Sequence, residues 1–476
     1  MNNWKLTVGL EVHIQLSTHT KMFCQCLRKY GEEPNSLTCP ICLAMPGALP
    51  SINQDAINMA LKLSHALNFS INNQTSFSRK NYFYPDLPKG YQISQYNDPI
   101  CFNGHLNIED NQEVYKIGIT RAHLEEDSGK LIHHSDNYSF IDLNRAGSPL
   151  IEIVSEPEIH SSEHAKLYLE KLKQIIKYLG ISDCDMEKGN LRVDINVSVN
   201  KKGQNKLGTR REVKNLNSFK SVQKAIDYEF KEQIKIIESG KDVIQSTLTW
   251  NEKNNSTEML RKKEDAHDYR YFPEPDLPNI EITSSQINKI SQQIPELPDQ
   301  KQKRFRKQYK LKDQDLKILI SDLDWANYYE SLVKFTDLPQ DTSNWVLGEI
   351  LGYANKHSIS INDVPIDLER ISELIILYKK GKLTNLNAKK IFHIMLTDSR
   401  NPSIIMENEK MMVIDDSNFL DEIVKDVFNK NKTEFERLKK GEDKLIGFFM
   451  GQIMKASKGK ADPQIIKKVI NKIITE

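Results

Sequence analysis

The stretch Leu6–Leu16, which reads LTVGLEVHIQL, decides the fold of the N-terminal part of the chain. Its even positions are all apolar, whereas its odd positions carry Thr, Gly, Glu, His and Gln. Strict alternation of this kind predicts a β-strand with one face in the core and one polar face. The stretch Leu191–Val199, LRVDINVSV, alternates in the same way and places Asp194 on its polar face. We therefore expect a sheet-rich N-terminal domain.

Helical periodicity interrupts these strands and later replaces them. Helices are expected at 55–67 and 163–179, and from residue 300 onward helical patterns dominate. The segment Tyr271–Pro278 holds three prolines in eight residues, which excludes a helix interior or a central strand and predicts a fixed loop. An amphipathic helix is expected after Pro463. The sequence pattern therefore changes from mainly strand-like to mainly helical near residue 290.

Length and composition set the broad class of the protein. A chain of 476 residues is expected to form two to four domains, at roughly 150 residues per domain. Its 66 basic and 65 acidic residues leave a net charge of +1, which excludes binding of nucleic acid through global charge alone. The longest uncharged apolar stretch, Leu445 to Met454, is too short to span a membrane, and no secretory signal is recognisable. We expect a cytoplasmic protein with no membrane partner.

Four of the six cysteines fall within 19 residues, at Cys24, Cys26, Cys39 and Cys42. Paired thiolates on two tight turns are a typical ligand set for tetrahedral zinc. Such a zinc site would be structural, because four protein ligands leave no position open for a substrate. The alternative is that the four cysteines are buried and act as small apolar side chains.

Carboxylates and one imidazole recur on the expected polar strand faces. Glu11 and His13 are two residues apart on one strand, so their side chains point the same way. Glu125 and Glu126 follow an apolar stretch, and Glu152 lies inside an apolar run where a lone carboxylate is costly unless it is paired. Together with Asp194, these oxygen ligands suit Mg²⁺ held between protein and phosphate. The alternative for each residue alone is a solvated strand face.

Cations and amides are concentrated in two stretches that fit phosphate or ribose contacts. The first, Arg79–Asp86, combines Arg79 and Lys80 with three aromatic residues that include Tyr82. The second, Arg210–Ser218, contains Lys214 and Asn215. For either stretch taken alone, a solvated loop is the better interpretation. No GxxxxGK[ST] and no GxG occurs, so an ATP site would have to be built from metal and side chains.

Two basic stretches could contact nucleic acid. Residues 301–312 contain seven basic residues and no acid, and the tail segment Gly451–Gly459 carries Lys455 and Lys458 beside small residues. Small neighbours allow a phosphate backbone to approach closely. A charge run is nevertheless often only a solvated face.

Seven motifs in the expected order resemble one known family across almost the whole chain. They are Gly9–His13, Arg79–Asp86, Asp142–Arg145, Pro149–Pro157, Lys214–Phe219, Asp268–Asp276 and Gly451–Gly459. The sequence resembles the B subunits of aspartyl/glutamyl-tRNA amidotransferases. The resemblance implies a heterotrimer with an amidase A subunit and a small C subunit, in which the B subunit uses ATP and Mg²⁺ to phosphorylate Glu on tRNA-Gln or Asp on tRNA-Asn. Ammonia from glutamine, hydrolysed by the A subunit, then displaces the phosphate.

The resemblance also implies an architecture and residue roles. The implied fold class is α+β: a cradle domain on a largely antiparallel sheet with helices (1–292), an all-α domain (293–405) and a small helical tail domain that binds tRNA (406–476). The implied metal ligands are Glu11, His13, Glu126 and Glu152, with Glu125 as a substitute. The implied catalytic residues are Lys80, Glu126, Asp194 and Lys214; the implied ATP contacts are Arg79, Lys80, Tyr82 and Asn215; and the implied tRNA contacts are Lys455 and Lys458.

Two other functions remain open from the residues alone. A non-catalytic RNA-binding scaffold would need only the cysteine loop and the basic tail, and it predicts that Glu11, Glu126 and Glu152 do not converge. A free-standing ATP-dependent ligase for a small carboxylic acid would act without RNA and would leave the basic tail unexplained.

Overall fold

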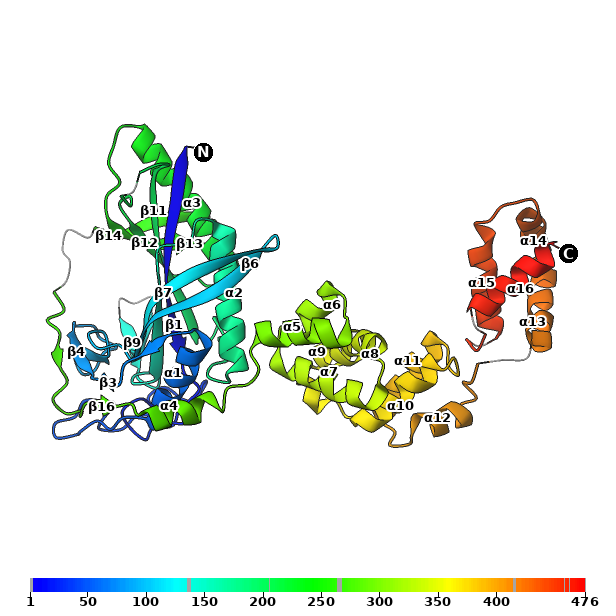
Figure 1. The fold of residues 1–476 in the computed structure, drawn as a ribbon, viewed down its shortest axis with the longest axis horizontal. Coiled ribbons are helices and arrows are strands. Elements are labelled where there is room, and N and C mark those ends of the chain that lie inside the picture. The colour runs from blue at the N-terminus through cyan, green and yellow to red at the C-terminus, as the bar shows by residue number, and fades with distance from the viewer. Residues whose placement is uncertain are drawn as a thin grey trace. The chain divides into compact units, whose positions relative to one another are not determined.

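The computed structural model of the protein describes residues 3–134, 138–204, 206–262, 268–413, 417–457, 459–461 and 463–475. The chain forms two compact units, Met1–Pro298 and Asp299–Glu476. The first unit combines a sheet with helices and the second is helical (Figure 1), which confirms the predicted α+β class. The predicted domain boundaries at 292 and 405 stay predictions.

The first unit is built on a 12-stranded sheet. The strands of the unit are β1 (Trp4–Gln15), β2 (Ser70–Ile71), β3 (Gln74–Thr75), β4 (Ser78–Asn81), β5 (Tyr91–Ser94), β6 (Cys101–Asp110), β7 (Glu113–Glu126), β8 (Lys130–His133), β9 (Ser139–Asp142), β10 (Pro149–Ser155), β11 (Leu191–Lys201), β12 (Arg211–Lys214), β13 (Ser246–Asn251), β14 (Ser256–Lys262), β15 (Phe272–Pro273) and β16 (Ile280–Glu281). The main order is β14-β13-β12-β11-β1-β10-β7-β5-β4-β15, and β6 pairs with both β7 and β2. Among the described pairs only β12 and β13 run parallel.

Helices cover one face of this sheet. They are α1 (Gln54–Ala66), α2 (Ser162–Tyr178), α3 (Phe219–Glu238) and α4 (Ser284–Ser291). The long helices α2 and α3 lie side by side along the sheet, where α3 contacts β11 (Figure 1). The even positions of β1 are buried in the same core as these helices. The predicted alternation in β1 and β11 is thus confirmed, and their polar positions lie on the opposite face.

The proline-rich segment 271–278 forms a loop with one short strand. β15 occupies two residues of it and pairs with Ser78 and Arg79 of β4 at the end of the sheet order. An edge is the position in a sheet where proline is tolerated, because no ladder donor is needed there. The segment also brings Glu274, whose side chain is buried, next to β4.

The second unit is helical throughout its described part. Its helices are α5 (Pro298–Tyr309), α6 (Asp313–Leu319), α7 (Leu323–Thr336), α8 (Pro339–Trp345), η1 (Val346–Ile350), α9 (Leu351–His357), η2 (Ile361–Asp363), α10 (Leu368–Lys379), α11 (Asn385–Met395), α12 (Pro402–Asn408), α13 (Ser417–Lys430), α14 (Lys432–Lys439), α15 (Leu445–Ala456) and α16 (Pro463–Thr475). One hydrophobic cluster spans residues 305–406 and a separate one spans 420–470. The helix expected after Pro463 is α16, which buries Ile466 and Ile470.

Candidate active site

The face of the sheet opposite the helices gathers the predicted acidic residues. In β1, His13 lies opposite Glu152 of β10, and Glu11 lies opposite Asp194 of β11. Glu152 in turn lies opposite His123 of β7. Residues directly opposite in an antiparallel pair point to the same face, so four neighbouring strands supply one polar surface.

His13, Glu125 and Glu152 form a tight group on this surface. The Nε2 atom of His13 lies 3.1 Å from Glu152 Oε2 and 3.6 Å from Glu125 Oε1. The possible ligand atoms of the three residues all lie within 4.8 Å of one another. His123 lies behind them, with its Nε2 atom 3.9 Å from an oxygen of each glutamate. One imidazole and two carboxylates at this spacing can bind a divalent cation.

The protonation behaviour of this group reflects burial and mutual charge. Burial opposes protonation of His13, but its hydrogen bond to Glu152 and the charge of that residue raise the pKa of His13 to about 9. Burial, and then the charge of Glu152, raise the pKa of Glu125 to about 7. Burial alone would raise the pKa of Glu152, but His123 and His13 lower it below its usual range. Burial lowers the pKa of His123 to about 4. Groups whose pKa values are pushed apart in this way are typical of functional sites.

A second acidic group lies beside the first and already surrounds a cation. It consists of Glu11, Asp194 and Glu212, whose ligand atoms also lie within 4.8 Å of one another. The Nζ atom of Lys214 is 2.5 Å from Asp194 Oδ2 and 2.9 Å from Glu212 Oε1. These carboxylates raise the pKa of Lys214 despite its burial, whereas burial and then the charge of Glu152 raise the pKa of Glu11.

Sequence reasoning missed Glu212 and did not single out His123. Glu212 joins the second group because β12 pairs with β11, where it lies opposite Asn196. His123 joins the first because β7 pairs with β10. Each residue is close in sequence to a predicted site residue, but only the pairing of strands places it in the site.

Glu126 lies apart from both groups. Both of its carboxylate oxygens accept from Lys89 Nζ, at 2.6 and 2.5 Å, and Oε1 also accepts from the backbone N–H of Ile93 at 3.0 Å. Because side chains alternate along β7, Glu126 points away from the face that carries Glu125. The structure therefore brings Glu125, rather than Glu126, together with His13 and Glu152.

Lys80 and Arg79 also diverge, because they are neighbours on β4. The Nζ atom of Lys80 lies 5.0 Å from the ring centre of Tyr269 and 5.9 Å from that of Tyr82. The positive charge of Lys80 also contributes to lowering the pKa of Glu152. Arg79 is occupied elsewhere, since its guanidinium donates to both oxygens of Glu274 at 2.8 and 2.7 Å.

The remaining predicted contact residues lie at loop and helix ends. Burial and then the charge of Glu125 raise the pKa of Tyr82. Asn215 follows β12 with a positive φ of 63° and an exposed side chain. Lys455 is exposed in the last turn of α15. The other predicted tRNA contact, Lys458, lies outside the described residues.

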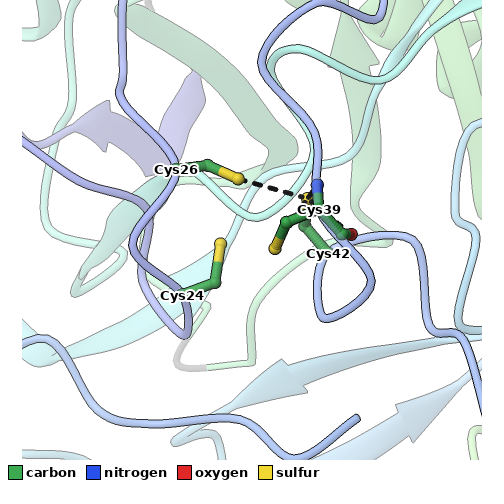
Figure 2. Close-up of side chains that lie close together, drawn as sticks. All are labelled: Cys24, Cys26, Cys39 and Cys42. Carbon is green, nitrogen blue, oxygen red and sulfur yellow. Dashed lines mark hydrogen bonds between the residues drawn. The ribbon is translucent and has the colours of Figure 1, made fainter.

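The four clustered cysteines converge as the sequence predicted. Cys24 and Cys26 lie on one turn and Cys39 and Cys42 on another, with their sulfur atoms directed toward a common space (Figure 2). The Sγ atom of Cys42 is 4.0 Å from that of Cys26 and 3.9 Å from that of Cys39. Tetrahedral Zn–S bonds of 2.3 Å would separate two sulfurs by about 3.8 Å. The geometry therefore fits a four-thiolate metal.

The loop between the two cysteine pairs is tied to the segment that precedes β10. Asn35 donates from Nδ2 to the carbonyl oxygen of Ile141 at 2.9 Å, and its Oδ1 accepts from the N–H of Leu143 at 2.8 Å. The Oδ1 atom of Asn144 accepts from the N–H of Leu37 at 2.8 Å. The segment Asp142–Arg145 therefore fixes the loop between the cysteine pairs by hydrogen bonds. Its sequence alone did not indicate this structural role.

Together, the fold and the site define an α+β protein with two acidic groups on one face of its sheet and a helical C-terminal unit. No helix among the described residues is long and apolar enough to cross a membrane. Comparison with known families assigns residues 6–288 to the GatB/GatE catalytic domain and residues 327–474 to the GatB domain.

Relatives of similar length agree with this assignment. A protein of Persephonella marina is 46% identical over 98% of this chain and 98% of its own length. Proteins of Thermodesulfovibrio yellowstonii (46% identical over 99% of this chain and 100% of its own) and Carboxydothermus hydrogenoformans (45% over 99% and 98%) are equally similar. All three are named as the B subunit of aspartyl/glutamyl-tRNA(Asn/Gln) amidotransferase. The chain belongs to the GatB family, whose relatives named here are subunits of a larger enzyme.

Proposed function

We propose that the protein amidates Glu on tRNA-Gln, Asp on tRNA-Asn, or both, as the B subunit of an ATP-dependent amidotransferase. The observation that carries the proposal is the group His13, Glu125 and Glu152 on the face of the sheet opposite the helices. Full-length similarity to relatives with that name supports the same activity. The partners would be an amidase A subunit, a small C subunit and the misacylated tRNA.

The chemistry of amidation accounts for the residues on this face. A carboxylate is a poor acceptor for ammonia, whereas its acyl phosphate is a good one, so the reaction needs a phosphoryl transfer first. His13, Glu125 and Glu152 would hold Mg²⁺. A magnesium ion there would neutralise negative charge on the transferred phosphoryl group. Lys80, whose charge acts on Glu152, would supply a further cation, and its ammonium lies near the rings of Tyr82 and Tyr269.

The second acidic group would hold the ammonium of Lys214 rather than a metal ion. Lys214 is held by Asp194 and Glu212, and its raised pKa keeps the ammonium charged. A lysine fixed in this way presents a permanent positive charge to a phosphate. Asn215, in the exposed turn directly after it, would contact the nucleotide or the tRNA.

The cysteine group would bind a structural Zn²⁺. Sulfur separations of 4.0 and 3.9 Å are close to those of a tetrahedral zinc complex. Four buried thiols that act as apolar side chains would have no reason to direct all four sulfurs to one point.

The release of ammonia would belong to a partner subunit, and the contact with tRNA to the C-terminal helices of this chain. The amidase partner would hydrolyse glutamine and release the ammonia. Lys455, together with Lys458, would contact the phosphate backbone of the tRNA.

The test is ATP hydrolysis by the co-purified complex with Glu-tRNA-Gln, Asp-tRNA-Asn or uncharged tRNA added separately. ADP release only with a misacylated tRNA is expected, and the responding tRNA identifies the substrate. A complex with working glutaminase but no response to either charged tRNA would favour the RNA-binding scaffold. ADP release without any RNA, driven by a small carboxylic acid, would favour the free-standing ligase.

A further inference from the structure

A completely buried lysine lies three residues before Cys24, the first cysteine of the cluster. The side chain of Lys21 is 0% exposed. Its Nζ atom lies 3.5 Å from Cys42 Sγ and 3.2 Å from the carbonyl oxygen of Leu143. Within the described part of the chain, these two atoms are the acceptors of the ammonium.

The burial of Lys21 requires negative charge nearby. An ammonium removed from water is costly unless a counter-charge compensates it, and the Leu143 carbonyl carries only a dipole. Glu126 is near, since a Cβ added at Gly147 would lie 3.6 Å from Lys21 Cδ and 3.8 Å from Glu126 Oε2, but both oxygens of that carboxylate are bound by Lys89. Of the two described acceptors of the ammonium, only the Cys42 sulfur can carry a negative charge.

Four neutral thiols cannot supply this charge, whereas a metal centre can. A zinc ion brings two positive charges against the four negative ones of its thiolates, so the centre carries an excess of two negative charges. A buried cation in contact with one sulfur offsets part of that excess. Lys21 is also well placed to do so, because its backbone N–H donates to the carbonyl oxygen of Cys26 at 3.0 Å. Its backbone thus belongs to the first cysteine turn and its side chain reaches the second.

We infer that Lys21 is the fifth residue of the metal centre: its ammonium donates to the Cys42 sulfur and compensates the negative charge of a four-thiolate zinc. The inference rests on the zinc of the proposed function. It also gives the centre a direct connection to the segment before β10, because the same ammonium donates to Leu143. The alternative role is packing alone, in which the alkyl chain of Lys21 fills the space beside Gly147 and the charge is irrelevant.

The experiment compares zinc retention in the full-length protein. Zinc content is measured first in the wild type, and then the rate of zinc release to a chelator is measured for Lys21→Met, Lys21→Arg and the wild type. The matched control is Lys301→Met, which removes another buried lysine, one that belongs to α5 of the second unit and donates to Asn327 at 2.8 Å. Replacing an outer-shell partner of a metal typically changes affinity about 10- to 100-fold. We expect an increase in release of that size for Lys21→Met, little change for Lys21→Arg, and none for Lys301→Met.

A second pair of variants separates charge from packing. Cys42→His replaces a thiolate by a neutral ligand and removes one negative charge, so adding Lys21→Met to Cys42→His should accelerate zinc release less than it does in the wild type. If Lys21→Met alone fails to fold, the double variant is expected to fold and bind zinc. Equal effects in the two backgrounds, a double variant that still fails to fold, or wild-type release from Lys21→Met overturns the role of Lys21. A wild type without zinc at purification, and unable to bind added zinc, instead overturns the metal itself.

Discussion

Glu125 and Glu126 are neighbours in the chain, yet their carboxylates lie on opposite faces of β7. Glu125 is with His13 and Glu152, whereas Glu126 is held by Lys89. The Glu125→Gln variant should therefore reduce ATP-dependent amidation by about 100-fold or more, because a carboxylate that would hold Mg²⁺ against the transferred phosphoryl group is lost. Its thermal stability should not fall, since the burial that raises the pKa of Glu125 disfavours its charged form.

The matched variant is Glu126→Gln. It leaves Lys89 buried beside a neutral amide, which should cost about 3–5 kcal/mol of stability. Steady-state amidation by the purified complex and thermal denaturation of the two variants measure the contrast. Full amidation by Glu125→Gln would contradict the role assigned to the first acidic group.

The first acidic group also predicts how magnesium binding depends on pH. In the metal-free protein the pKa of His13 is about 9 and that of Glu125 about 7. A metal ligand must be deprotonated, so at pH 6 both residues hold a proton that Mg²⁺ must displace. Affinity should rise from pH 6 to pH 9, first as Glu125 and then as His13 loses its proton.

Calorimetric titration with Mg²⁺ in buffers of different ionisation enthalpy measures this proton release directly. The expected result is release of more protons at pH 6 than at pH 9. Affinity that is unchanged over this range would contradict binding to His13 and Glu125.

At the scale of elements, one side chain at the start of α1 forms hydrogen bonds to the segment just before Cys24. The Oδ1 atom of Asn53 accepts from the N–H of Asp55 at 2.9 Å, as an N-cap does. Its Nδ2 atom donates to the carbonyl oxygens of Thr20 and Lys21, both at 3.1 Å. Loss of a cap alone costs about 1 kcal/mol, and each further hydrogen bond adds roughly 1 kcal/mol.

Asn53→Ala should therefore destabilise the first unit by roughly 2–3 kcal/mol. Ser161→Ala is the control, because Ser161 caps α2 by accepting from His164 N–H at 3.0 Å. Among the described residues, its side chain is not hydrogen-bonded to Thr20 or Lys21. Urea denaturation of both variants gives the comparison. An equal loss of stability in the two variants would show that the links to Thr20 and Lys21 contribute nothing.

Individual strands could be predicted from the sequence, whereas the pairing between strands could not. Alternation identified β1 and β11 and the face on which Glu11, His13 and Asp194 lie, because side-chain direction within a strand is a local property. Glu212 was not selected, because its place depends on the pairing of β12 with β11. Alternation alone also gives no account of the Asp142–Arg145 segment, whose partners lie about 107 residues earlier in the chain.

At the scale of the whole molecule, the C-terminal helices have a hydrophobic core of their own. Residues of α13, α14, α15 and α16 form a cluster separate from that of the preceding helices. Removing residues 406–476 should therefore leave the first unit folded while tRNA binding weakens. Circular dichroism of the truncated complex measures folding, and filter binding measures its affinity for tRNA. Unchanged tRNA affinity would show that the tail does not bind the tRNA.

A substitution of Lys455 tests the proposed contact between the tail and tRNA in the intact complex. It is exposed in the last turn of α15, and a lysine that contacts phosphate releases counterions when it binds. Lys455→Ala should weaken binding of all tRNAs to a similar degree and reduce the slope of log K against log salt by about 1. Lys432→Ala, which removes an exposed lysine from α14 outside the Gly451–Gly459 motif, should leave the slope unchanged. If both variants lower the slope equally, the tail attracts RNA through its general positive charge, and the motif has no special part in recognition.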